Sequence, residues 1–113
     1  MPDQSDRTLR IRRSFIFAPA LRPELYPKAL ACGSDIVCVE LEDGVAPDHK
    51  DVARNNMLDI FSQPQADDGI ERIVRVNCLR SRFGLADIQA ILDTDSPPPA
   101  LMLPKVNTPD EVK

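Results

Sequence analysis

The sequence predicts an α/β fold in which parallel strands alternate with helices. Four short apolar runs rich in β-prone residues lie near residues 14–18, 35–41, 71–77 and 100–105. The segments that separate these runs space their apolar residues as helices do. Since strands that alternate with helices form parallel sheets with right-handed crossovers, we expect four parallel strands that neighbour one another in chain order.

The first unit pairs the strand at 14–18 with a helix at 23–32, which Gly33 is suited to end. Pro27 lies early in this helix and lacks a backbone donor, so we expect an irregular first turn. The apolar face of the helix consists of Tyr26, Ala29 and Leu30.

The second unit joins a nearly continuous apolar strand at 35–41 to a helix at 48–61. Asn56 interrupts the apolar stripe of this helix. The stripe has helical spacing and consists of Val52, Ala53, Met57, Ile60 and Phe61.

The third unit joins the strand at 71–77 to a helix whose apolar face consists of Leu85, Ile88, Ile91 and Leu92. A proline-rich linker at 96–99 leads to the fourth strand. After it, Thr108 as N-cap and Pro109 at the first helical position are typical of a helix start.

Four such units are half of an eight-fold (β/α)8, or TIM, barrel, and a whole barrel needs about 250 residues. We therefore expect residues 13–113 to form the N-terminal half of a TIM barrel, truncated after the fourth strand, and residues 1–12 to form a flexible arm. An open doubly wound sheet is the structural alternative. Its nucleotide-binding versions lose support because no glycine-rich phosphate-binding motif follows any strand.

The composition argues against several other classes of protein. The net charge is −4 and Lys and Arg do not cluster, so we expect no nucleic-acid partner. No apolar run approaches the ~20 residues that span a membrane, and the polar, acidic start is not a secretory signal. Cys32, Cys38 and Cys78 form no disulfide or zinc pattern, so we expect them to be reduced and buried in a cytoplasmic protein.

Polar side chains follow every predicted strand at its carboxyl end, where parallel α/β proteins bind their ligands. These side chains are the candidates for a functional site. In chain order they are Arg22, Glu40, Glu42, Asp43, Arg75, Asn77, Lys105 and Asn107.

Side-chain alternation predicts which of these groups face the interior of the barrel. On the second strand Glu40 and Glu42 face inward, and the face under the helices consists of Val37, Val39 and Leu41. On the third strand Arg75 and Asn77 face inward. Since an inward charge is costly unless it is paired, we expect an acidic group of the second strand beside Arg75. A purely structural ion-pair network is the alternative.

Short motifs spread over nearly the whole chain resemble one enzyme family. They are RSFIFAP at 13–19, RPE at 22–24, KAL at 28–30, VELEDGVAP at 39–47 followed by Lys50 and residues 53–54, RVN at 75–77, GLAD at 84–87 and LPKV at 103–106. In this order and spacing they resemble the citrate lyase beta-subunit group of the HpcH/HpaI aldolase superfamily, which includes citryl-CoA, malyl-CoA and citramalyl-CoA lyases.

The resemblance implies a cytoplasmic TIM-barrel lyase that cleaves or forms a carbon–carbon bond beside a carbonyl, with Mg²⁺ holding a 2-oxo acid. Its implied substrate is a CoA thioester of a hydroxy acid, or a related free acid, and complete members commonly form homotrimers or hexamers. Taken with the strand-end positions, it assigns catalytic roles to Arg75, Glu42 and Asp43. Substrate-binding roles fall to Arg75, Arg22, Asn77 and Lys105.

The resemblance also implies that the direct Mg²⁺ ligands lie beyond Lys113, with Glu42 and Asp43 reaching the metal only through water. We therefore expect the chain alone to be inactive. Glu40 stands where the family more often has Asp, and Asn107 replaces an acidic residue, which leaves the substrate open. Two alternatives remain: a non-catalytic half-barrel that pairs with another chain, and a TIM-barrel enzyme of the phosphoenolpyruvate/pyruvate type.

Overall fold

The computed structural model describes residues 14–43 and 45–104, and these form a four-stranded sheet. All strand pairs are parallel and the strands neighbour one another in chain order, as predicted. The strands are β1 (Phe15–Pro19), β2 (Ile36–Glu40), β3 (Glu71–Arg75) and β4 (Leu101–Met102). The expected arm at 1–12, Lys105 and the expected helix start at Thr108 lie outside the described residues.

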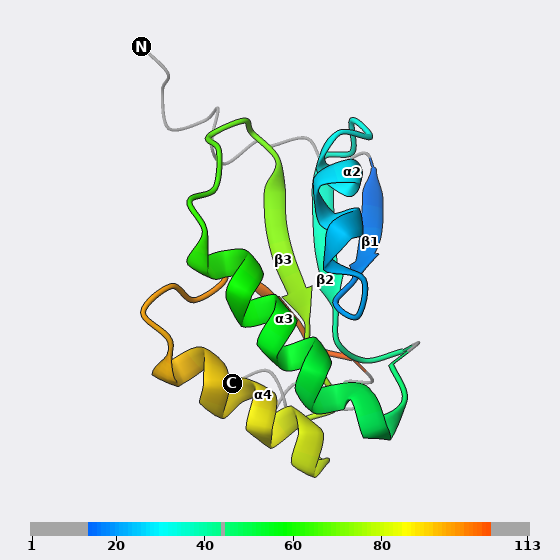
Figure 1. Ribbon diagram of the computed structural model, residues 1–113, viewed down its shortest axis with the longest axis vertical. Coiled ribbons are helices and arrows are strands. Elements are labelled where there is room, and N and C mark those ends of the chain that lie inside the picture. The colour runs from blue at the N-terminus through cyan, green and yellow to red at the C-terminus, as the bar shows by residue number, and fades with distance from the viewer. Residues whose placement is uncertain (1–13, 44, 105–113) are drawn as a thin grey trace.

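The helices alternate with the strands, as Figure 1 shows. They are the 3-10 turn η1 (Pro23–Leu25), α2 (Tyr26–Leu30), the 3-10 turn η2 (Pro47–His49), α3 (Lys50–Ser62) and α4 (Arg82–Asp93). The irregular first turn expected from Pro27 is confirmed, because η1 precedes a short α2. Ser81 caps α4, since its hydroxyl oxygen accepts a hydrogen bond from the Gly84 backbone N–H.

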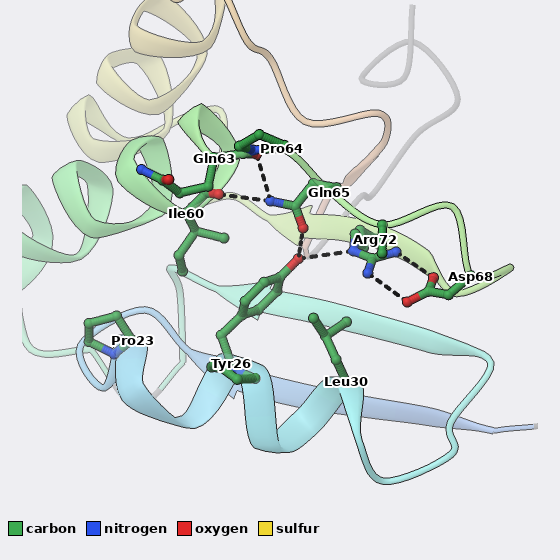
Figure 2. Close-up of a pocket in the computed structure, with 11 residues that line it drawn as sticks. Pro23, Tyr26, Leu30, Ile60, Gln63, Pro64, Gln65, Asp68 and Arg72 are labelled. Carbon is green, nitrogen blue, oxygen red and sulfur yellow. Dashed lines mark hydrogen bonds and ion pairs between the residues drawn. The ribbon is translucent and has the colours of Figure 1, made fainter.

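An open groove of about 430 Å³ lies between α2, the C-terminal end of α3 and the amino end of β3 (Figure 2). Tyr26 donates its hydroxyl hydrogen to Gln65 (2.8 Å) and accepts from Arg72 Nε (3.2 Å). Arg72 also donates to both carboxylate oxygens of Asp68, and these hydrogen bonds lower the pKa of Asp68 to about 2. Arg72 lies near the start of β3, so this network is at the end of the sheet opposite the candidate site.

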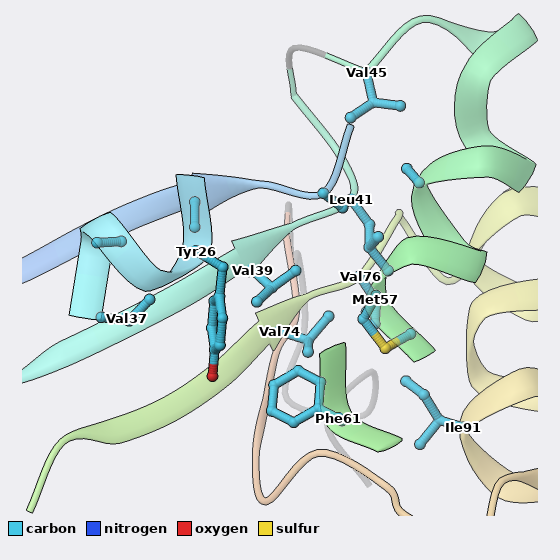
Figure 3. Packing of buried hydrophobic residues seen from close by; sticks show 14 residues of the cluster. Tyr26, Val37, Val39, Leu41, Val45, Met57, Phe61, Val74, Val76 and Ile91 are labelled. Atoms are coloured by element: carbon cyan, nitrogen blue, oxygen red, sulfur yellow. The ribbon is translucent and has the colours of Figure 1, made fainter. Parts of the chain in front are cut away.

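The main core lies between the sheet and the helices (Figure 3). Side-chain alternation places Val37, Val39 and Val74 on this face with no measurable exposure. Burying each such side chain fully stabilises the fold by about 1.5–3 kcal/mol. The helices contribute Tyr26, Ala29, Ala53, Met57, Phe61 and Ile91 to the same core. The face assignment predicted for the second strand is therefore confirmed.

The opposite face of the sheet has no helix packed against it within the described residues. A smaller apolar cluster of Ile36, Cys38 and Ile73, with Ala100 and Met102 against it, lies there. On this face Phe15 and Phe17 are 39% and 42% exposed. In a closed barrel the face opposite the helices is the packed interior.

Three apolar side chains expected in the core are exposed instead: Val52 by 52%, Leu85 by 64% and Leu92 by 74%. On α4 the buried residues are Gly84, Asp87 and Ile91, so the buried stripe shares Ile91 with the predicted apolar face and also includes a carboxylate. Asn56, which interrupts the stripe of α3, donates to the Ala20 carbonyl at 2.9 Å and so ties α3 to the loop after β1.

Gly84 allows α4 to approach the segment that follows β3. A Cβ atom at this position would lie 2.1 Å from the Cys78 carbonyl oxygen and 2.7 Å from that of Asn77. We expect Gly84→Ala to lower the free energy of unfolding by about 1–3 kcal/mol through overpacking, although alanine favours a helix interior by about 1 kcal/mol. Urea unfolding measures this, with Gln89→Ala on the exposed side of α4 as control. A Gly84→Ala protein as stable as the parent would contradict the close approach.

Candidate active site

Arg75 and Glu40 form an ion pair at the carboxyl end of the sheet. They are the last residues of β3 and β2 and are partners in the strand register, so their side chains leave the same face side by side. Arg75 Nε donates to Glu40 Oε1 at 3.0 Å, and Arg75 Nη2 contacts Glu40 Oε2. This pairing confirms the prediction of an acidic group of the second strand beside Arg75.

Two further carboxylates lie near the same guanidinium. Glu42 Oε1 is 3.7 Å from Arg75 Nε, and Asp43 Oδ2 is 3.6 Å from Arg75 Nη2. Glu42 is buried, whereas the Asp43 side chain is 68% exposed. The Glu42 backbone N–H donates to Glu40 Oε1 at 2.7 Å, which fixes the turn after β2 against the ion pair. Among the described residues, three carboxyl groups therefore lie within 4 Å of one arginine.

Phe17 of β1 forms the floor beneath Arg75. The guanidinium carbon lies 4.5 Å from the centroid of the Phe17 ring, a cation–π contact that also restricts the plane of the guanidinium. The sequence reasoning did not identify Phe17 as a site residue. Side-chain alternation along β1 could have indicated it, because alternate residues of the strand face inward. Phe17 is registered with Cys38 and therefore lies on the inner face.

Cys38 lies below Arg75 on the same face and is fully buried. Burial raises the pKa of the Cys38 thiol to about 11, outweighing the opposite effect of Arg75. The thiol therefore stays protonated near neutral pH and is no nucleophile. The expectation that all three cysteines are buried is wrong for Cys32, which is exposed, and Cys78 is partly buried.

The inward orientation predicted for Asn77 is wrong. Its side-chain nitrogen donates to Asp87 Oδ2 of α4 at 2.6 Å, and its backbone N–H donates to the same oxygen at 2.9 Å. The reason is that β3 ends at Arg75, so strand alternation does not extend to residue 77, and a buried carboxylate supplies the acceptor. Asn77 supports the loop after β3 and does not join the Arg75 cluster.

Arg22 and Lys105 are the remaining predicted site residues. The Arg22 side chain is 63% exposed and pairs with Glu24 at 2.8 Å, so the structure does not bring it into the Arg75 cluster. Lys105 lies outside the described residues, as does Asn107.

The donors of the described residues do not by themselves form a magnesium site. Within residues 14–43 and 45–104, no group of three or more His, Cys, Asp or Glu side chains is placed to hold a metal ion. The reason is local, since Glu40 and Glu42 direct oxygens at a guanidinium and so face a cation already. Any metal beside this cluster needs ligands from elsewhere.

Comparison with known proteins identifies the family. The model of the HpcH/HpaI aldolase/citrate lyase family matches residues 13–113. The chain belongs to this family. It is 34% identical over 106 residues to the citrate lyase subunit beta of Escherichia coli K12, and 32% identical over 105 residues to an L-malyl-CoA/beta-methylmalyl-CoA lyase of Rhodobacter capsulatus. These alignments cover 94% and 91% of the chain but 34% and 32% of the relatives.

Solved structures of family members match the fold. CitE of Mycobacterium tuberculosis in complex with magnesium and acetate has a TM-score of 0.73 at 34% identity, covering 92% of this chain and 41% of that one. The M. tuberculosis citrate lyase beta subunit with oxaloacetate and magnesium has a TM-score of 0.70 at 34% identity, covering 89% and 43%. The four parallel strands are thus part of a TIM-barrel-type fold, and the chain spans about a third of the curated relatives' length. No helix among the described residues is both long and apolar enough to cross a membrane.

Proposed function

We propose that this chain supplies the substrate-binding part of a magnesium-dependent carbon–carbon lyase, which acts on a hydroxy-acyl-CoA or a related hydroxy acid and gives a 2-oxo acid. The observation that supports this most is Arg75, fixed by Glu40 and Phe17 at the carboxyl end of the sheet. TIM-barrel enzymes bind their substrates at that end. The relatives are a citrate lyase beta subunit and an L-malyl-CoA/beta-methylmalyl-CoA lyase, and related structures contain magnesium with oxaloacetate or CoA.

Arg75 is suited to bind the carboxylate or carbonyl oxygen of the 2-oxo acid. Within the described residues, its hydrogen bonds and ion pairs to Glu40, Glu42 and Asp43 use Nε and Nη2. The Nη1 side of the guanidinium is therefore the edge that we assign to the substrate. Cleavage of a bond beside a carbonyl builds negative charge on oxygen, and a cation already oriented there stabilises that charge without reorganisation. Asn77, which bonds Asp87, takes no part in this assignment.

A magnesium ion would act as a Lewis acid on the carbonyl and carboxylate oxygens of the 2-oxo acid. We assign its direct ligands to residues beyond Lys113, since the described residues form no group of three or more His, Cys, Asp or Glu that could hold the ion. Glu42 and Asp43 would face it across a water molecule. Their position beside Arg75 at the carboxyl end of the sheet supports this arrangement.

The test uses a full-length protein that contains this segment. Turnover is measured with malyl-CoA, citramalyl-CoA, citryl-CoA and free oxaloacetate, each with Mg²⁺ and with excess EDTA. We expect magnesium-dependent cleavage of at least one CoA thioester. Turnover of the free acid alone would favour a phosphoenolpyruvate/pyruvate-type enzyme. No turnover of any of them would favour the non-catalytic half-barrel, and either result would contradict the proposal.

A further inference from the structure

Lys50, the first residue of α3, is buried behind the strand ends on the helix side of the sheet, with 8% exposure. Its ammonium group donates to the carbonyl oxygens of Leu41 at 3.1 Å and Glu42 at 2.9 Å. Both carbonyls belong to the turn after β2 that presents Glu42 and Asp43. Since burying an ammonium is costly unless its donors are satisfied, these contacts fix the turn to the start of α3.

Asp87 has the same relation to the segment after β3. It is fully buried on α4, and its Oδ2 accepts from the backbone N–H of Asn77, two residues beyond Arg75. Its other oxygen accepts from Arg54 Nε of α3 at 2.8 Å. Gly84 lets α4 approach the same segment closely.

The Lys50 contacts to the turn after β2 and the Asp87 contacts to the segment after β3 are connected through side chains of α3 and α4. Lys50 and Arg54 lie one turn apart on α3, and Phe83 and Asp87 lie one turn apart on α4. Lys50 Nζ is 5.8 Å from the centroid of the Phe83 ring, and Arg54 pairs with Asp87. The starts of α3 and α4 are therefore locked together, and each holds one of the two segments that meet at the Arg75 cluster.

We propose that Lys50, Arg54 and Asp87 are positioning residues, which set the distance between Arg75 and the carboxylates of Glu42 and Asp43. This inference rests on the proposed function, since it concerns the same site. The separations at stake are 3.6–3.7 Å, so a shift of either segment by about 1 Å changes them by a large fraction, and misplacement of that size costs enzymes about 100-fold in rate.

The first measurement is the turnover of Lys50→Met and Asp87→Asn in the full-length protein, with melting temperatures on the same samples. Lys28→Met, at an exposed lysine of α2, is the matched control. We expect kcat to fall about 10- to 100-fold in both site variants at a temperature where each is folded, and to stay normal in the control. A fall in melting temperature with unchanged kcat would assign the three residues to stability alone and overturn the proposal.

The second measurement separates positioning from general damage by combining Lys50→Met with Arg75→Lys. If Lys50 acts through the Arg75 cluster, its substitution costs far less once Arg75 is already altered, and we expect less than a threefold further loss. Equal fold-losses in both backgrounds would overturn the proposal. Asp87→Asn takes the place of Lys50→Met if that variant does not fold.

The third measurement does not depend on activity. In hydrogen exchange of the full-length protein, we expect Lys50→Met to loosen residues 41–43 and Asp87→Asn to loosen residues 76–81, with α2 unchanged. Exchange that stays at parent rates, or that rises uniformly, would overturn the positioning role. If the parent protein turns over none of the substrates, the proposed function fails. Hydrogen exchange still decides whether Lys50 and Asp87 hold the segments after β2 and β3 in place.

Discussion

Arg75→Lys in the full-length protein is expected to keep the fold and lose most lyase activity, roughly 10²- to 10³-fold. Arg75 donates through Nε and Nη2 to Glu40, which leaves another edge of the same rigid plane for the substrate. A lysine has one ammonium group and cannot fill both places. One lost charge-assisted contact in the transition state costs on the order of 2–4 kcal/mol. Turnover and melting temperature on the same samples measure the two effects.

A structural role for Arg75 predicts a different pattern. If Arg75 only neutralises Glu40 and Glu42, a lysine should largely substitute for it. Arg75→Ala should then lower the melting temperature, because it removes the guanidinium that pairs with the buried Glu40 carboxylate. Arg80→Lys, at an exposed arginine in the segment after β3, controls for the substitution itself. Near-normal turnover in Arg75→Lys would remove Arg75 from the active site.

The isolated chain 1–113 is expected to self-associate and to have no lyase activity. The inner face of its sheet exposes Phe15 and Phe17, which a closed barrel would bury. The order of the described strands leaves β1 and β4 at the edges, where unpaired backbone groups favour pairing with other chains. Light scattering across a range of concentrations measures the association, and the lyase assays measure the activity.

Two charged substitutions distinguish the surfaces responsible. Phe15→Lys places a charge on the inner face and should shift the chain toward monomer, whereas Leu92→Lys changes the exposed side of α4. We expect the larger effect from Phe15→Lys, because Phe15 contacts Phe17 and is registered with Ile36 of the apolar cluster on the open face. A monodisperse, active monomer of this length would contradict both expectations.

Local sequence patterns were sufficient for the order of the elements and for the face that each residue of β2 presents. The period-2 alternation of β2 separates Val37 and Val39 from Cys38 and Glu40 without any knowledge of the partner strands. The pairing of Arg75 with an acidic group of β2 also followed, because neighbouring parallel strands bring their last residues to one edge and an inward charge needs a partner. That this group is Glu40 was decided by the strand register.

Only the tertiary structure decided which polar groups near the carboxyl end of the sheet stay out of the Arg75 cluster. Asn77 turns to Asp87, and Asp87 is buried because Arg54, 33 positions away in the chain, supplies its counter-charge. The same burial gives the core face of α4 to Asp87 and leaves Leu85 and Leu92 exposed. Periodicity encodes the direction of a side chain within one element. Whether a charge can be buried depends on partners from other elements, so Phe17 beneath Arg75 and Lys50 behind Glu42 emerged only when the chain was folded.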